Sequence, residues 1–179
     1  NGGSSWISIG VPGQPVYKSC WVAPSGEVLI GARGGISRFH PLDGGVSPED
    51  IAWPATPDTS QEFNAIWGAG TTLLAAGNKQ VVLALDGGTW TYLSGPLTGE
   101  TYYAISGTET EAYIGGSYGD VVQFSISGGS PMLIPITPPP LINVWGLWAA
   151  GADDYFAVGS RFSGSNPGSR STGHGKSCS

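Results

Sequence analysis

Four short apolar segments with small residues at their ends recur at nearly equal spacing along the chain. They cover residues 27–32, 73–77, 112–116 and 155–159, and their last residues are 45, 39 and 43 positions apart. Each segment is too short for a stable helix and lies next to turn-forming residues, a pattern that is typical of a β-strand. A period this long, built from strand-like segments, predicts a tandem structural repeat.

The second repeat shows its internal order most clearly. Apolar, β-prone runs at 63–67, 73–76, 81–85 and 90–93 are separated by the short polar or glycine-rich turns GAG, GNKQ and DGG. Asp-Gly and Gly-Gly pairs are strong hairpin signals, and strands joined by such short turns pair antiparallel. This repeat is therefore predicted to be a four-stranded antiparallel sheet.

The other repeats follow the same order. First strands are expected at 16–22, 102–106 and 141–145, and third strands at 36–39 and 121–126. Trp53 and Trp90 are interpreted as aromatic residues of fourth strands. The proline-rich stretch 131–140 is interpreted as a stiff connection between repeats, with a ligand for a proline-recognising partner as the alternative. No helix is predicted, because no stretch keeps a 3.6-residue period for three turns.

A repeated four-stranded unit of this length is typical of a β-propeller blade, and such sheets bury their faces by stacking on one another. The predicted fold is all-β, a partial β-propeller of about three and a half four-stranded antiparallel blades. The units are roughly 11–53, 54–93, 94–134 and 135–160. Residues 161–179, rich in Gly and Ser, are expected to form a disordered tail. Three explanations of the incomplete ring stay open: a fragment, which is favoured, association with another chain, or completion of the last blade by residues 6–9.

Two segments resemble a known group of repeats. Residues 65–68, 75–77 and 86–90, together with 144–146 and 153–159, look like the repeats of secreted bacterial propellers of the Asp-box (BNR-like) and photosystem-assembly-factor-like group. The resemblance covers roughly residues 6–160. It departs from a full Asp box, since Ala84 replaces Ser or Thr and one residue is missing before Trp90. Such families include sialidases, lectins and assembly scaffolds, so the resemblance implies a fold and leaves the function open.

The charge balance narrows the range of partners. Charged residues make up 11% of the chain, against about 25% in an average domain, and the net charge is −6. With 7 Lys and Arg in total, the composition argues against nucleic acid or an anionic membrane surface as partner. A surface of Ser, Thr, Gly and Asn favours an extracellular or periplasmic (secreted) location. Cys20 is expected to be a buried free thiol, and a bridge to Cys178 is the alternative.

The candidate ligand-binding residues are aromatic and polar side chains near the predicted channel. Three Trp residues end or follow the first strands, and four polar or aromatic residues lie in the second turns, which open on the same face. An exposed Trp stacks on a sugar or a peptide; the alternative is that these Trp residues form the core between blades. The seven candidates are Arg33, Trp67, Asn78, Lys79, Tyr118, Trp145 and Trp148.

The carboxylates are interpreted as structural. Asp43 and Asp86 precede Gly-Gly pairs and are expected to cap hairpin turns rather than bind calcium or sugar. Four others are expected in solvated turns rather than as paired catalytic carboxylates: Glu109, Glu111, Asp153 and Asp154. No metal or cofactor is expected.

The sequence thus predicts a non-enzymatic, extracytoplasmic propeller module that binds a protein or carbohydrate through one face. The alternatives are a blade fragment of a larger Asp-box glycoside hydrolase (sialidase-like) and a purely structural repeat fragment. Self-association that completes the ring is a further expectation.

Overall fold

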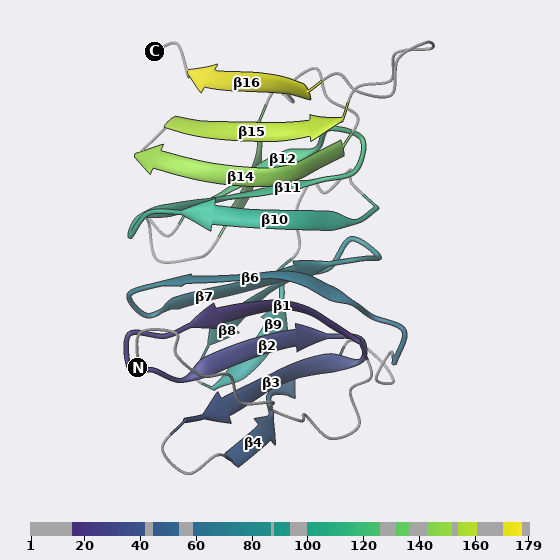
Figure 1. Ribbon diagram of the computed structural model, residues 1–179, viewed down its shortest axis with the longest axis vertical. Coiled ribbons are helices and arrows are strands. Elements are labelled where there is room, and N and C mark those ends of the chain that lie inside the picture. The colour runs from purple at the N-terminus through teal and green to yellow at the C-terminus, as the bar shows by residue number, and fades with distance from the viewer. Residues whose placement is uncertain are drawn as a thin grey trace, which may run out of the picture.

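The computed structural model describes residues 16–41, 45–53, 59–86, 88–93, 100–125, 132–136, 143–151, 154–160 and 170–176, with backbone alone for 50, 86, 132 and 170–176. Four sheets lie one above the other (Figure 1). We call each sheet a blade and number the blades in chain order. No helix occurs among these residues, and therefore none that is long and apolar enough to cross a membrane.

Each blade is a meander of antiparallel strands in sequence order. Blade 1 consists of β1 (Tyr17–Val22), β2 (Val28–Ala32), β3 (Gly35–His40) and β4 (Gly45–Pro48). Blade 2 consists of β6 (Phe63–Ala69), β7 (Thr72–Gly77), β8 (Val82–Asp86) and β9 (Thr89–Tyr92). Blade 3 consists of β10 (Tyr102–Gly107), β11 (Glu111–Gly116), β12 (Val121–Ser125) and β13 (Met132–Pro135). Blade 4 consists of β14 (Asn143–Gly151), β15 (Asp154–Ser160) and β16 (Arg170–Lys176).

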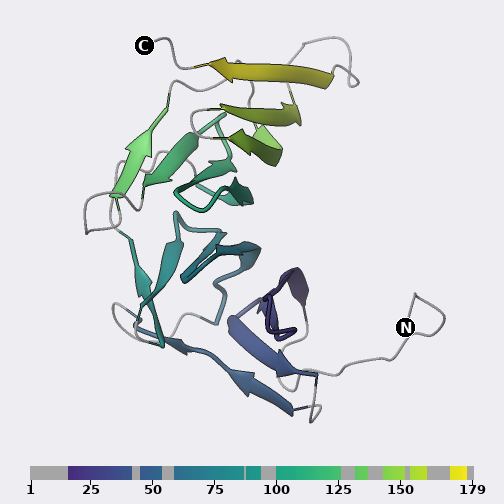
Figure 2. The same ribbon diagram turned by 90° about the vertical axis from the view of Figure 1, so that its left-hand side faces the viewer.

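The blades follow an open arc (Figure 2). The first strand of each blade lies on the concave side, and the later strands lie towards the convex side. We call β1, β6, β10 and β14 the inner strands. Three blades of at least four strands and a fourth with three strands among the described residues confirm the predicted all-β partial propeller.

The hydrophobic core lies in three layers between consecutive blades, which we call seams 1, 2 and 3. Seam 1 buries Leu29 and Ile36 of blade 1 against Phe63, Ala75 and Trp90 of blade 2. Seams 2 and 3 repeat this arrangement between blades 2 and 3 and between blades 3 and 4. The central strands are therefore covered on both faces, and every residue of β11 is buried. This explains why the second strands are the most uniformly apolar segments of the sequence.

Tryptophan packs on glycine at two of the seams. A Cβ added to Gly68 would lie 2.7 Å from Cζ2 of Trp21, and one added to Gly107 would lie 2.7 Å from Cζ2 of Trp67. Both distances are shorter than real Cβ contacts. The indole of one blade therefore needs a residue without a side chain on the inner strand of the next blade.

All four inner strands carry a β-bulge at the same position. The register against the second strand shifts between residues 17 and 19, 63 and 65, 102 and 104, and 144 and 146. One extra residue is thus placed near the start of each inner strand, after the first paired residue of β1, β6 and β10 and after the second of β14. These four bulge residues are Lys18, Asn64, Tyr103 and Trp145.

The chain passes from blade 1 to blade 2 earlier than predicted. The short strand β5 (Asp50–Ile51) pairs parallel with β9 and extends blade 2 to five strands. The fourth strand of blade 1 is β4, so the assignment of Trp53 to that strand is wrong. Trp53 follows β5, and its ring centroid lies 6.3 Å from that of Tyr92. Likewise, residues 132–135 of the proline-rich stretch form the outer strand β13 rather than a connection.

Two further expectations differ from the structure. Residues 170–176 form β16 and pair with β15 along its length, so the prediction of disorder is wrong for this segment. Backbone N–H and C=O groups make this ladder, and it therefore needs no large side chains. Cys20 is exposed rather than buried. Residues 6–9, Asp43, Asp153, Cys178 and the rest of the predicted tail lie outside the described residues.

Candidate ligand-binding face

One edge of the arc gathers the turns between second and third strands, and we call it the turn face. Isolated bridges join these turns to the start of the next inner strand: Arg33 with Glu62, Asn78 with Thr101, and Ser117 with Asn143. The same pairing therefore recurs at all three seams. Any site on this face is held by two consecutive blades.

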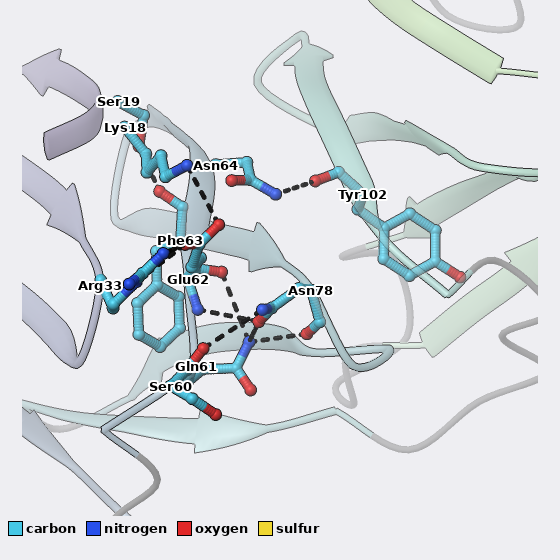
Figure 3. A network of polar contacts seen from close by, with 10 residues as sticks. All are labelled: Lys18, Ser19, Arg33, Ser60, Gln61, Glu62, Phe63, Asn64, Asn78 and Tyr102. Atoms are coloured by element: carbon cyan, nitrogen blue, oxygen red, sulfur yellow. Dashed lines mark hydrogen bonds and ion pairs between the residues drawn. The ribbon is translucent and has the colours of Figure 1, made fainter. Parts of the chain in front are cut away.

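Glu62 is the charged centre of the turn face at seam 1 (Figure 3). Its Oε1 accepts hydrogen bonds from Nη2 and Nε of Arg33 at 2.7 and 2.9 Å, and its Oε2 lies 3.1 Å from Nζ of Lys18. The hydrogen bond from Arg33, followed by that from Lys18, lowers the pKa of Glu62. The carboxylate thus stays ionised and joins two cations of blade 1 to blade 2.

The Asn78 side chain fixes the segment that leads into β6. Its Oδ1 accepts hydrogen bonds from the Glu62 amide at 2.8 Å and from Nε2 of Gln61 at 2.6 Å. Its Nδ2 donates to the Ser60 carbonyl at 3.3 Å. The Asn78 side chain therefore stabilises its own blade, and only part of it is presented to a ligand.

The turn after Asn78 has an unfavourable backbone conformation. Lys79 and Gln80 have φ values of 56° and 61°, and the Val81 amide donates to the Asn78 carbonyl at 3.3 Å. Two left-handed residues in succession are the geometry of a type I′ turn, which favours Asn and Gly. For residues with a side chain the left-handed conformation costs roughly 1–2 kcal/mol each. Strain of this kind concentrates at functional sites.

This strained turn borders a hollow of about 450 Å³ between blades 2 and 3. The Gln80 amide donates to the Glu100 carbonyl at 3.1 Å and so closes one side. Nζ of Lys79 donates to Oγ of Ser60. The residues that line the hollow include one basic and one acidic residue: Asn78, Lys79, Gln80, Glu100 and Thr101.

Two bulge residues form an aromatic pair at seam 3. The ring centroids of Tyr103 and Trp145 are 4.4 Å apart, with 40° between the ring planes. The indole Nε1–H of Trp145 donates to Oγ of Ser160 at 3.3 Å, yet 53% of Trp145 is exposed. Tyr118, also exposed, lies in the adjacent turn, next to the Ser117–Asn143 bridge. Tyr103 and Ser160 thus hold the Trp145 indole in place while about half of its surface stays exposed to solvent.

The structure brings five of the seven candidate residues to the turn face: Arg33, Asn78, Lys79, Tyr118 and Trp145. Trp67 instead packs in seam 2 against Gly107, as the alternative reading of the Trp residues predicts, and we leave it out of the site. Trp148 lies on the open side of blade 4. Tyr103 was not among the candidates, although it has the same position in its repeat as Trp145.

The carboxylates do not form a paired site among the described side chains. Glu111 is buried, contrary to its predicted place in a solvated turn, because it accepts hydrogen bonds from Oη of Tyr113 at 3.0 Å and from Nε2 of Gln123. These bonds hold its carboxylate against Tyr113 of β11 and Gln123 of β12. No group of three metal-binding side chains occurs in the part of the chain that the structure describes.

No family model and no curated protein matches the sequence. Solved structures do match. The computationally designed Ika4 protein has a TM-score of 0.68 at 14% identity, over 95% of this chain and 99% of that one. The fold is a β-propeller. The WD40 repeats of RRP9 match with a TM-score of 0.67 at 13% identity, over 84% of this chain and 47% of theirs.

A bacterial sensor gives a third match. The extracellular domain of the putative hybrid two-component system BT3049 from B. thetaiotaomicron has a TM-score of 0.62 at 15% identity, over 84% of this chain and 23% of that one. The chain thus spans about half of the WD40 structure and about a quarter of the sensor domain. The TM-scores establish the propeller fold. At identities of 13–15%, the matches show no closer relationship.

Proposed function

We propose that this chain is a non-enzymatic propeller module that binds a ligand on its turn face, with the Tyr103–Trp145 pair as the contact platform. The observation that carries the proposal is the exposed Trp145 ring, supported by Tyr103 at 4.4 Å and tied at its N–H to Ser160. A ring held in this way loses little conformational entropy on binding. Exposed Trp and Tyr residues of this kind commonly provide most of an interface's binding energy.

A carbohydrate suits this platform best. A sugar ring offers an apolar C–H face, which stacks on an indole, and hydroxyl groups around its edge, which hydrogen-bond to polar neighbours. Asn143 and Ser160 provide such polar groups beside Trp145, and the strained turn with Lys79 offers a charged contact further along the same face. A peptide segment of a protein partner is the second ligand class. An extracytoplasmic location, favoured by the composition, belongs to the same proposal.

The test is a binding screen of the purified chain on a glycan array and a peptide array, followed by calorimetry with the best ligand. Replacing a Trp that anchors an interface costs about 2 kcal/mol, or about 30-fold in affinity. Trp145→Ala is expected to cause this loss, and Tyr103→Ala a smaller one. Trp148→Ala, measured at concentrations at which the unmodified chain is a monomer, is the control, since it removes a similarly exposed Trp that lies off the turn face.

The outcomes separate the alternatives. Binding to peptides alone, with the same dependence on Trp145, would assign a protein partner. Hydrolysis of a fluorogenic sialoside would support the sialidase-like alternative. Binding that is unchanged in Trp145→Ala, or absent from both arrays, would refute the proposed site.

A further inference from the structure

The seams of this propeller are directional. Each blade presents a forward face to the blade that follows and a rear face to the blade that precedes it. On the forward side, Trp21 and Trp67 reach over Gly68 and Gly107 of the next blade. At seam 3 small residues occupy both positions. Ser106 replaces the Trp and Ala149 replaces the Gly, and the Ala149 amide donates to Oγ of Ser106 at 2.9 Å.

One half of such a seam is left uncovered at each end of the arc. Trp148 and Val158 on the forward face of blade 4 are 61% and 50% exposed, and Phe156 packs beside Trp148 with ring centroids 5.4 Å apart. Val22 and Tyr17 on blade 1 are 59% and 50% exposed. Exposed apolar surface gathered on two opposite faces is typical of an interaction surface rather than of a monomer's surface.

The uncovered residues occupy the positions that form the interior seams. Trp148 follows its bulge residue by three positions, as do Trp21 and Trp67, and Val22 corresponds to Gly68. Val158 occupies the position of Gly115 in blade 3, and Tyr17 occupies the position of Val144 in blade 4. At seam 3 these two positions face each other, since a Cβ added to Gly115 would lie 3.0 Å from Cβ of Val144. One end of the arc therefore carries the forward half of a seam, and the other end carries the rear half.

We propose that a second copy of this chain covers both ends, with the forward face of blade 4 of each copy on the rear face of blade 1 of the other. A seam that joins unlike faces closes into a ring when the rotation allows it. The arc makes up 47% of the matched WD40 chain, so two copies provide nearly one such ring. This proposal does not depend on the proposed ligand.

The new seams are wider than the interior ones. Val22 stands where Gly68 and Gly107 admit an indole, and Val158 stands where Gly115 admits Val144. Large side chains thus meet large ones at both positions, and overpacking of this kind weakens an interface. Val22→Gly restores the Trp-on-Gly contact of seams 1 and 2, so it tightens the assembly.

The experiment measures the mass of the full chain by sedimentation velocity and light scattering over a wide concentration range. We expect a dimer that dissociates on dilution, about 10-fold tighter in Val22→Gly and at least 30-fold weaker in Trp148→Ala. Tyr118→Ala, an exposed aromatic residue away from both ends, is expected to leave the dimer unchanged. Circular dichroism checks that each variant keeps its strands.

Cross-linking tests the orientation. In a background with both native cysteines replaced by serine (Cys20→Ser and Cys178→Ser), Tyr17→Cys combined with Val158→Cys is expected to give disulfide-linked dimers on mild oxidation, and neither single variant is expected to do so. A chain that stays monomeric at all concentrations would overturn the proposal. A dimer that is indifferent to Trp148→Ala and Val22→Gly and is not cross-linked would overturn it as well.

Discussion

Replacing Gly77 with alanine is expected to destabilise blade 2 more than any other single-methyl change in that sheet. Gly77 ends β7 and pairs with Phe63, the residue directly before the bulge of β6. A Cβ at this position would overlap the carbonyl oxygen of Glu62 and lie 2.8 Å from its carbonyl carbon. These atoms belong to the backbone, so they cannot move aside as the end of a flexible side chain can.

The expected loss is about 4 kcal/mol of unfolding free energy. Overpacking against rigid neighbours costs roughly 1–3 kcal/mol. Moving the backbone apart also weakens the bond from the Asn78 amide to the Glu62 carbonyl and the bond from the Glu62 amide to Oδ1 of Asn78, at 3.1 and 2.8 Å. Each bond contributes about 1 kcal/mol net. A domain with a total stability of about 5–15 kcal/mol would lose a large share of it.

Urea unfolding followed by tryptophan fluorescence and circular dichroism measures this loss. Gly70→Ala is the matched control, because Gly70 has a φ of 56° but nothing within 4 Å of an added Cβ; only the backbone cost of about 1–2 kcal/mol is expected there. Blade 1 already has Ala32 at the position equivalent to Gly77. A Gly77→Ala loss below 1 kcal/mol would show that β7 adopts the backbone of β2, and the steric argument would be refuted.

Three further perturbations test the seams and the turn face. Trp67→Ala is expected to lose about 3–5 kcal/mol in urea unfolding, because it leaves a cavity in seam 2, and an effect as small as that of a surface residue would contradict its packing on Gly107. Asn78→Ala is expected to lose about 1–3 kcal/mol, since the Glu62 N–H loses its side-chain acceptor and the buried Gln61 amide keeps only backbone acceptors; an unchanged urea midpoint would argue against this network. The lowered pKa of Glu62 predicts a melting temperature that falls as the pH drops from about 5 towards 3, because the unfolded carboxyl group takes up its proton first. Glu62→Gln should flatten this acid dependence, and the same slope in both proteins would assign it to other carboxylates.

Much of the fold could be predicted because its signals are local. Each second strand ends in small residues where the next turn begins. The predicted first strand 63–67 is confirmed as β6, Phe63–Ala69. The same local patterns placed the strands of blade 2 and the first three strands of blade 3 within a few residues. Hairpin turns and apolar runs are properties of a few consecutive residues, so a single sequence contains them.

The parts that sequence reasoning missed depend on pairing between distant segments. β5 leaves blade 1 to join β9, and β16 pairs with β15 through backbone groups alone. Glu111 appeared to belong to a solvated turn, but Gln123 of the adjacent strand β12 donates a hydrogen bond to its carboxylate in the folded sheet. No short pattern of residue types encodes these partners.

In the candidate site, too, the features that depend on local sequence could be predicted, and those that depend on contacts between distant residues could not. Its place on the turn face could be predicted, because the repeat aligns equivalent turns. The aromatic pair could not, since Tyr103 contacts Trp145 only through the bulges that turn both residues out of the regular alternation. A residue-by-residue alignment of the four inner strands would have pointed to it.

The bulge in each inner strand frees one residue of the concave wall from the apolar packing of the seams, and leaves it polar or aromatic contacts with the neighbouring blade. The inserted residue stands outside the alternation that packs the seams, so its identity is not constrained by the core. This explains how one position holds an ammonium group, an amide, a phenol and an indole, in Lys18, Asn64, Tyr103 and Trp145, along a single scaffold. Four substitutions, one in each blade, would give the inner wall a new specificity while every seam keeps its present residues.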